Sequence, residues 1–380
     1  MSPTSAMSPL RNRLTRSGLA SLAAVALTVG VAGCGSDSGD STSTGSEGSA
    51  ISAERCAENK AAGKITYLSG YQYQSSVSIL EYIAADKLGY FKDLCLDVGL
   101  KPGTGDTAQN TKLLASGQAT VSPVSQQDVI QARANGIDIT GISSYSDAGL
   151  EILMTNKDIT DLTQLDGKVV GHKGFVPAGV RAMLVKAGVK WDSLKLVKQG
   201  YDPSVLPRRQ GGLEALTGFV SNEPNQLRAA GKDVTVWKPV DYGVPGSLGA
   251  MAVNPAFAKK HPHAVEDILR AALHAYDYCS AGDKHITECV GYAARLSGPT
   301  YDKKLNATIW KTETQVAKDN PTPGQPFGAI DPKNVGGLVD MLHQFKIVPD
   351  SVTAARAEGW FDASPVKNIH TADKLVWPAP

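Results

Sequence analysis

The chain has 380 residues, of which 42% are hydrophobic and 20% charged, and its formal net charge is +1. This length can bury the core of one large domain or of two ordinary ones. The 38 basic residues are matched by 37 acidic ones, so the composition excludes the electrostatic signature of a nucleic-acid-binding protein, and it also excludes a fibrous or wholly disordered chain. Five cysteines, an odd number, require an explanation.

The first 33 residues have the pattern of an export signal. Arg11, Arg13 and Arg16 form a basic head, and residues 18–31 follow as an uncharged run of apolar and small residues. A membrane-spanning helix needs about 20 apolar residues, which is more than this run provides. We therefore predict a signal peptide over residues 1–33, the alternatives being a core helix or a membrane anchor.

The sequence Val31-Ala32-Gly33-Cys34 resembles the lipobox of bacterial lipoproteins, which the signal peptidase cuts just before the cysteine. The resemblance implies that Cys34 becomes the lipidated first residue of an extracytoplasmic protein held at the outer face of the cell membrane. Removal of the three arginines would change the net charge from +1 to about −2. Residues 35–50 are mainly Ser, Gly, Thr and acidic residues and cannot bury a core, so we predict a flexible tether over residues 34–62.

Four cysteines remain for an exported protein, in which disulfides persist. They allow three pairings. Cys279 and Cys289 flank a short polar stretch and are the expected partners, which leaves Cys56 to pair with Cys95. The alternative of a metal site lacks CxxC spacing and clustered histidines, and we predict neither a metal nor a cofactor.

From residue 64 onward, short β-like segments alternate with helical ones. The pattern predicts, in chain order, a strand (64–68), a helix (77–88), a strand (96–100), a helix (107–115), a strand (119–124), a helix (125–134) and a strand (137–143). This rhythm is typical of parallel βαβ units.

The rhythm then repeats in a second half. The predicted elements are a strand (168–172), a helix (178–187), two strands (194–199 and 214–220), a helix (223–230), two more strands (234–237 and 248–253) and a long helix beginning near residue 264. The remainder to residue 345 is predicted to be mostly helical, with an irregular tail.

In open α/β sheets, ligands bind outside the carboxyl ends of the strands. The loops at these positions are rich in aromatic and uncharged hydrogen-bonding side chains, which suits a planar ring with polar edge groups better than an anion. The predicted ligand-binding residues are Tyr71, Tyr73, Ser75, Gln126, Asp128, Tyr145, Phe175, Tyr201, Asn222, Glu223 and Tyr242.

Several of these residues also have a purely structural interpretation. Glu223 could simply occupy the first turn of a helix capped by Asn222, and Gln126 and Asp128 could cap the helix that starts beside them. Each aromatic residue could instead pack within a lobe. Lys173, which also follows a strand, is interpreted as a solvated surface residue.

Several segments now match a known family. Residues 82–91 look like its A-x-x-x-G-Y-F signature, residues 113–119 like its L-x-x-G-x-A-D turn with Thr120 in place of the aspartate, and residues 161–168 like its D-L-x-G-K entry to a second lobe. Residues 125–129, 132–137, 219–224 and 241–244 resemble its thiamine-pyrimidine and riboflavin branches. The chain thus resembles substrate-binding lipoproteins of ABC importers in the thiamine-pyrimidine, sulfonate, nitrate and taurine family (NMT1/THI5-like, SsuA-like).

The resemblance implies a two-lobed periplasmic-binding-protein fold (type II, clamshell), each lobe being a mostly parallel sheet flanked by helices. It places the first part of lobe I at residues 63–155, lobe II at 156–249, and the second part of lobe I with the tail at 250–380. Its implied function is closure of the lobes around a thiamine pyrimidine precursor or a riboflavin-like heterocycle. The implied partners are a membrane permease and a cytoplasmic ATPase, with the protein itself a monomer.

Other functional classes stay open at this point. The ligand could be a small anion such as sulfonate, taurine or nitrate. The chain could also be a sensor lipoprotein without transport, or an enzyme like those that make the thiamine pyrimidine. The sequence shows no Ser-His-Asp order, paired carboxylates or Cys-His set, so we do not predict an enzyme.

Overall fold

The computed structural model describes residues 50–380. The predicted signal peptide, Cys34 and most of the predicted tether therefore lie outside the described residues. Within residues 50–380, none of the helices combines the length and the apolar character needed to cross a membrane.

The first sheet has five strands in the order β2-β1-β3-β10-β4. Strand β1 is parallel to β2 and β3, and β10 is antiparallel to β3 and β4. The strands are β1 (Lys64–Leu68), β2 (Asp97–Lys101), β3 (Val121–Pro123), β4 (Thr140–Ser143) and β10 (Met251–Val253). We call this sheet and its helices lobe I, residues 50–146 and 251–380.

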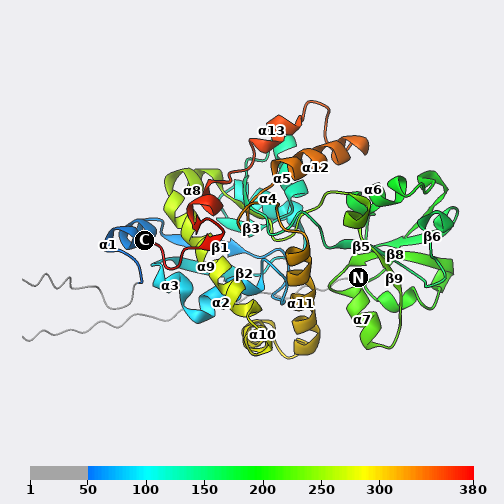
Figure 1. Ribbon diagram of the computed structural model, residues 1–380, viewed down its shortest axis with the longest axis horizontal. Helices are drawn as coiled ribbons and strands as arrows, with labels where there is room; N and C mark the ends of the chain where they lie inside the picture. The colour runs from blue at the N-terminus through cyan, green and yellow to red at the C-terminus, as the bar shows by residue number, and fades with distance from the viewer. Residues whose placement is uncertain (1–49) are drawn as a thin grey trace, which may run out of the picture. The chain divides into compact units, whose positions relative to one another are not determined.

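The second sheet repeats this arrangement in the order β7-β6-β8-β5-β9. Strand β6 is parallel to β7 and β8, and β5 is antiparallel to β8 and β9. The strands are β5 (Glu151–Thr155), β6 (Val169–His172), β7 (Lys195–Lys198), β8 (Leu213–Phe219) and β9 (Thr235–Trp237). With α6 (Ala178–Lys186) and α7 (Glu223–Ala229), this sheet forms lobe II, residues 151–242, drawn in green in Figure 1.

The predicted α/β fold, with mostly parallel sheets, is confirmed. Each sheet is mixed, because one of its five strands is antiparallel to its neighbours. In each lobe the reversed strand is the one that follows a crossing between lobes, β5 after the first crossing and β10 after the return. The start of β5 pairs with the end of β8, Glu151 opposite Phe219. Because the chain enters lobe II at the edge where the parallel strands end, its first strand must run the opposite way.

The first crossing lies earlier than predicted. Residues 151–155 were placed in lobe I, but they form β5 of lobe II. The two crossing segments pair with each other, since the Leu248 N–H donates to the Ser146 carbonyl (3.1 Å). A Cβ on Gly246 would lie 2.4 Å from the backbone nitrogen of Gly149, so this approach requires glycine.

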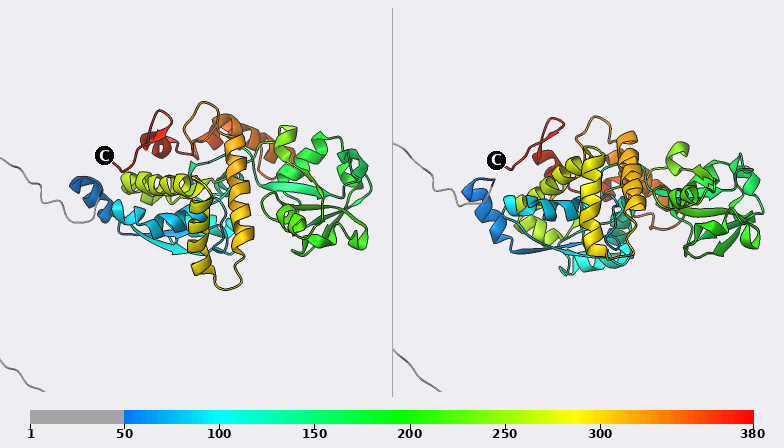
Figure 2. Two further views of the ribbon diagram at one scale, coloured as in Figure 1. Left: turned by 60° about the horizontal axis from the view of Figure 1, so that its bottom comes forward. Right: turned by 90° about the horizontal axis from the view of Figure 1, so that it is seen from below.

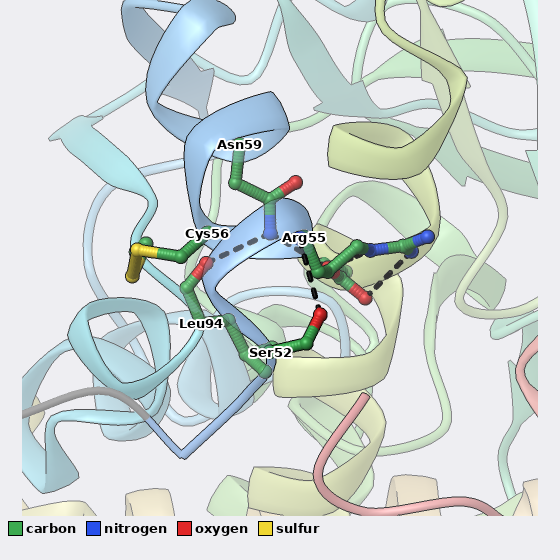
Figure 3. The surroundings of a disulfide bond; sticks show 7 residues. Ser52, Arg55, Cys56, Asn59 and Leu94 are labelled. Carbon is green, nitrogen blue, oxygen red and sulfur yellow. Dashed lines mark hydrogen bonds and ion pairs between the residues drawn. A yellow bond between two sulfur atoms is a disulfide. The ribbon is translucent and has the colours of Figure 1, made fainter. Parts of the chain in front are cut away.

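The predicted tether extends too far along the chain. Residues 53–61 form helix α1 (Ala53–Ala61), which Ser52 caps by accepting from the Arg55 N–H. Cys56 forms a disulfide with Cys95, and Asn59 donates to the Leu94 carbonyl (2.8 Å), as Figure 3 shows. The guanidinium of Arg55 also bonds Asp267 (2.8 Å) and Glu266 (2.8 Å) on α9 (Pro262–Ser280). These contacts order the end of the segment that composition assigned to the tether.

Lobe I encloses its sheet in helices from both ends of the chain. A second disulfide, Cys279–Cys289, joins α9 to α10, so both predicted pairings are present. The helices are α2 (Leu80–Leu88), α3 (Tyr90–Asp93), α4 (Thr107–Ala115), α5 (Gln126–Ala134), α8 (Pro255–Lys260), α9, α10 (Asp283–Ser297), α13 (Ala354–Glu358) and α14 (Ser364–Asn368). A short hairpin, β11 (His370–Thr371) and β12 (Lys374–Leu375), follows near the C-terminus.

Two C-terminal helices contact lobe II as well as lobe I. Helix α11 (Lys303–Asp319) packs on α10 and on α7, and both views of Figure 2 show it in orange beside the green lobe. Helix α12 (Pro332–Gln344) packs on α5 and on α6. Any movement of lobe II must therefore proceed along these two helices.

Candidate functional site

The densest group of predicted site residues follows the parallel strands of lobe II. Phe175 comes after β6, Tyr201 after β7, and Asn222 and Glu223 after β8, and Lys173, which was not predicted, lies in the same loop as Phe175. Because β6, β7 and β8 are parallel, their carboxyl ends share one edge of the sheet, and the topology brings these loops together.

Glu223 is the buried centre of this group, with 1% of its surface exposed. Its Oε2 accepts from the Phe219 N–H (2.7 Å), and its Oε1 accepts from the Asn222 amide (3.3 Å) and pairs with the Lys173 ammonium. Asn222 occupies the N-cap position of α7, but its side chain makes no capping bond and instead accepts from Gln226 (2.7 Å). Glu223 thus lies in the first helical turn while its carboxylate has three partners.

Lys173 is not the solvated residue that the sequence suggested. Its side chain is only 16% exposed, and its Nζ lies 5.4 Å from the ring centre of Tyr201 and 5.8 Å from that of Phe219. Burial lowers the pKa of Lys173. The sequence missed both Lys173 and Phe219, because a lysine or an aromatic residue at a strand end carries no local sign of its partner.

Three of the predicted aromatic side chains face solvent. Tyr201 is 80% exposed and Phe175 76%, and on lobe I Tyr71 is 48% exposed. Large rings with this exposure gain binding energy when a planar ligand covers them. Their role as ligand contacts stays a prediction.

Other predicted residues of lobe I serve the packing of that lobe. The ring of Tyr73 packs against the lobe I core. Ser75 is buried, its Oγ 2.6 Å from the Tyr301 hydroxyl and its N–H donating to Asn306 (2.8 Å). The ring of Tyr145 is buried against Tyr276 and Phe327.

The predicted residues of α5 have capping and packing contacts. Asp128 forms a capping box with Ser125, and burial raises the pKa of the Asp128 carboxyl. Gln126 is buried, and its Oε1 accepts from Asn334 of α12 (2.9 Å) while its Nε2 has no partner among the described residues. Tyr242 is half-buried in the core cluster that includes α6, away from the group around Glu223. The structure therefore does not bring all eleven residues together.

Two cavities lie between α11 and the strand ends of lobe II. The enclosed one measures about 170 Å³ and the more open one about 360 Å³, and both include Val220, Lys238, Val316 and Asp319. None of the eleven predicted residues lines either cavity. Residues of α11 line both, and the sequence did not predict this role of α11. In the described part of the chain, no three histidine, cysteine or acidic side chains are grouped so as to hold a metal ion.

The family model described as NMT1/THI5 like matches residues 76–284, more than half of the chain. The chain belongs to this family. The match begins in the segment before α2 and includes all of lobe II, so it contains the whole group around Glu223.

Among characterised proteins, the chain is 27% identical over 215 residues to the formylaminopyrimidine-binding protein of Halalkalibacterium halodurans. The alignment covers 54% of this chain and 63% of that relative, so it extends over less than two thirds of the relative's length.

Solved structures confirm the periplasmic-binding-protein fold. The putative periplasmic sulfonate-binding protein SsuA from Methylobacillus flagellatus KT superposes with a TM-score of 0.59 at 14% identity, covering 80% of this chain and 93% of that one. The periplasmic nitrate-binding protein NrtA from Synechocystis PCC 6803 gives 0.57 at 12% identity, covering 80% and 87%. At these identities the likeness concerns the fold alone.

Proposed function

We propose that this protein is the extracytoplasmic solute-binding component of an ABC importer and that it binds a small planar nitrogen heterocycle by closure of its two lobes. The ligand class includes thiamine pyrimidine precursors and riboflavin-like rings. The formylaminopyrimidine-binding relative supports this choice, since its alignment covers about half of the chain. The permease and the ATPase are the partners that this function requires.

The observation that carries the proposal is a buried carboxylate beside exposed rings. A carboxylate has about four acceptor positions, and Glu223 uses three, so one is left for an exocyclic amine or a ring N–H of a ligand. Tyr201 offers an exposed aromatic face beside Lys173, and the exposed ring of Phe175 belongs to the same loop as Lys173. Lobe closure would bring Tyr71 of lobe I toward the same ligand. Contacts from both lobes are needed, because only a ligand that binds the closed state better can drive closure.

A second candidate is a small anion, as in the sulfonate- and nitrate-binding proteins that share the fold. The partly buried ammonium of Lys173 is the observation that favours it. However, Glu223 already neutralises this cation, and an anion would have to approach a buried carboxylate. We therefore give preference to the heterocycle.

Calorimetry on the purified protein tests the choice, with formylaminopyrimidine, hydroxymethylpyrimidine, riboflavin, taurine and nitrate as ligands. We expect a heterocycle to bind, and Glu223→Gln to weaken an amine-bearing ligand by about 1–3 kcal/mol, because a charged acceptor is lost. Asp233→Asn, which removes an exposed carboxylate of lobe II paired with Lys157, is the matched control and should bind as the parent does. Binding of the anions alone would reject the heterocycle.

The anchoring of the protein at the outer face of the membrane is a separate part of the proposal and rests on the lipobox at Cys34. We expect Cys34→Ala to abolish labelling by a fatty-acid analogue in cells, and persistent labelling would reject the lipobox. An importer permease and ATPase encoded beside the gene would favour transport over a sensor. A product formed from a bound pyrimidine would instead indicate an enzyme.

A further inference from the structure

Glu313 is a buried acidic residue on α11, far along the chain from the group around Glu223. Its Oε2 accepts from the Ser76 hydroxyl (2.6 Å) and from the Val77 N–H (2.7 Å). Its Oε1 accepts from the Ser221 hydroxyl (2.7 Å). Both oxygens of one carboxylate are therefore bonded to residues outside α11.

These donors belong to the two ligand loops of opposite lobes. Ser76 and Val77 directly follow the loop after β1 that carries Tyr71, and Ser221 precedes Glu223 by two residues. A second hydrogen bond also joins lobe II to α11, since the Asn225 amide of α7 donates to Thr312 (3.2 Å). The carboxylate of Glu313 thus joins the ligand loop of lobe I to that of lobe II.

The three donors are neutral, so the charge of Glu313 is compensated by hydrogen bonds rather than by a cation. Burial is the largest cause that raises the pKa of Glu313, to about 7, and the hydrogen bonds from Ser76, Ser221 and Val77 oppose it. Charge-assisted hydrogen bonds are about twice as strong as neutral ones, so ionisation strengthens this contact.

Other ionisable groups lie around Glu313 on every helix packed near it. Glu81 of α2 and Tyr276 of α9 interact with it electrostatically. Arg228 of α7 bonds Asn225 (2.7 Å), and Asp283 of α10 pairs with Lys311 of α11 (2.7 Å) at the exposed side. A variant at Glu313 itself is therefore needed to separate its titration from theirs.

We propose that Glu313 is a positioning residue that fixes the loop of Ser221–Glu223 against the loop of Tyr71–Ser76 and thereby sets the affinity of the site between them. The part that concerns affinity rests on the proposed function. A loop held in its binding geometry before the ligand arrives loses less conformational entropy on binding. Glu313 acts through Ser221 and is not itself a ligand contact.

Hydrogen–deuterium exchange on the full chain without ligand tests the contact directly. Ser221→Ala removes the donor of lobe II alone and should speed exchange of residues 219–226 by about threefold to tenfold, while residues 70–80 stay protected. Glu313→Ala should speed exchange in both segments. Thr314→Ala is the matched control on α11, because Thr314 bonds only to carbonyls of its own helix, and it should leave both segments unchanged.

Affinity and its pH profile separate positioning from a general loss of structure. Calorimetry with formylaminopyrimidine should show Ser221→Ala binding about threefold to tenfold more weakly than the parent. The parent should bind more tightly at pH 8 than at pH 6, because Glu313 is ionised at pH 8 and then accepts stronger hydrogen bonds. Glu313→Gln keeps an acceptor for Val77 and a donor for Ser221, so its loops should stay protected while its affinity should not change between these pH values.

The results that would reject the positioning role differ from those that would reject the proposed function. Unchanged exchange of residues 219–226 in both Ser221→Ala and Glu313→Ala would overturn the positioning role whether or not any heterocycle binds. Faster exchange with unchanged affinity, or a Glu313→Gln pH profile equal to the parent's, would overturn it as well. If the parent binds none of the heterocycles, the proposed function fails and the exchange data alone decide the contact between the loops.

Discussion

In lobe I, helices α2, α9 and α10 enclose the first sheet, and the lobe contains both disulfides. In lobe II, α6 and α7 flank the second sheet, and residues 151–242 contain no cysteine. The strand order is nevertheless the same in both. On the α7 side, lobe II has a small core of its own with six buried side chains, among them Ile152 and Leu227. Other buried side chains of lobe II, among them Leu153 and Met183, join a larger cluster that includes residues of α5 and α12. One topology is thus reinforced by disulfides in lobe I and, in lobe II, by packing against helices of lobe I.

Each lobe also has a buried glutamate, and the two glutamates differ in their partners. Burial raises the pKa of Glu81 in lobe I to about 8, although the Ser78 N–H (2.7 Å) and the nearby Tyr145 hydroxyl oppose this shift. Glu223 of lobe II has Lys173 beside it. The buried acid of lobe II is thus paired with a lysine, whereas that of lobe I is met only by uncharged hydrogen-bond donors.

The largest expected effect comes from removing the disulfides of lobe I. Cys56 and Cys95 close a segment of 39 residues, and Cys279 and Cys289 one of 10. Chain entropy predicts that Cys56→Ser/Cys95→Ser lowers the free energy of unfolding by about 4 kcal/mol and Cys279→Ser/Cys289→Ser by about 3 kcal/mol. Urea unfolding measures both losses.

Hydrogen exchange then shows where each loss occurs. Peptides of lobe I should exchange faster in both double variants, while those of residues 151–242 keep their protection. Equal acceleration in the two lobes would mean that they unfold as one unit, and the contrast between a disulfide-linked lobe and a lobe without disulfides would have to be abandoned.

The next expected effect is a pH dependence of the unfolding free energy that results from the titration of Glu81 in lobe I. Its pKa in the folded protein, about 8, lies above the ordinary value of 4.5, so the folded state keeps a proton that the unfolded state releases. Stability therefore falls as the pH rises from about 5 to about 8. Glu81→Gln cannot lose that proton, and relative to the parent it should gain about 4 kcal/mol of unfolding free energy between pH 5 and pH 9.

Thermal unfolding at several pH values checks this prediction. Asp86→Asn, on the same helix but half-exposed and paired with Lys87, is the control and should follow the parent at every pH. A Glu81→Gln curve parallel to the parent's would show that the buried carboxyl of lobe I does not titrate in this range.

Local sequence patterns predicted much of the fold because apolar periodicity shows which face of an element is buried and capping residues and glycines mark where an element ends. The strand over residues 64–68 and the helix over residues 107–115 have the bounds that alternation, capping and glycine positions indicate. Strand β5 was not predicted because its middle residues, 152–154, are all apolar and do not alternate with polar ones, so nothing in them shows which sheet the strand joins.

The site was less predictable, because its contacts join residues far apart in the chain. Lys173 and Glu223 are separated by 50 positions, and Ser221 and Glu313 by 92. An exposed ring such as Tyr201 could be proposed from its place after a strand. The partner of a lysine or of a helix glutamate depends on how the sheets and α11 pack, which periodicity does not encode.

The smallest effect concerns two ion pairs of lobe II that differ in burial. The carboxylate of Glu223 is buried and that of Asp233 is exposed, although each pairs with a lysine, Lys173 and Lys157 respectively. A double-mutant cycle with Lys173→Met and Glu223→Gln should give a coupling of about 1–2 kcal/mol in unfolding free energy, because each single variant leaves a buried partner unsatisfied. The cycle with Lys157→Met and Asp233→Asn should give less than about 0.5 kcal/mol, since water and salt screen exposed charges.

Repeating both cycles in 1 M salt sharpens the distinction, since screening acts on exposed pairs and much less on buried ones. The coupling of Lys173 with Glu223 should persist while that of Lys157 with Asp233 disappears. If the two couplings are equal, the pair at the centre of the candidate site does not stabilise lobe II more than a surface pair does. Lobe II would then have to be held by its apolar core and by its contacts with α11 and α12.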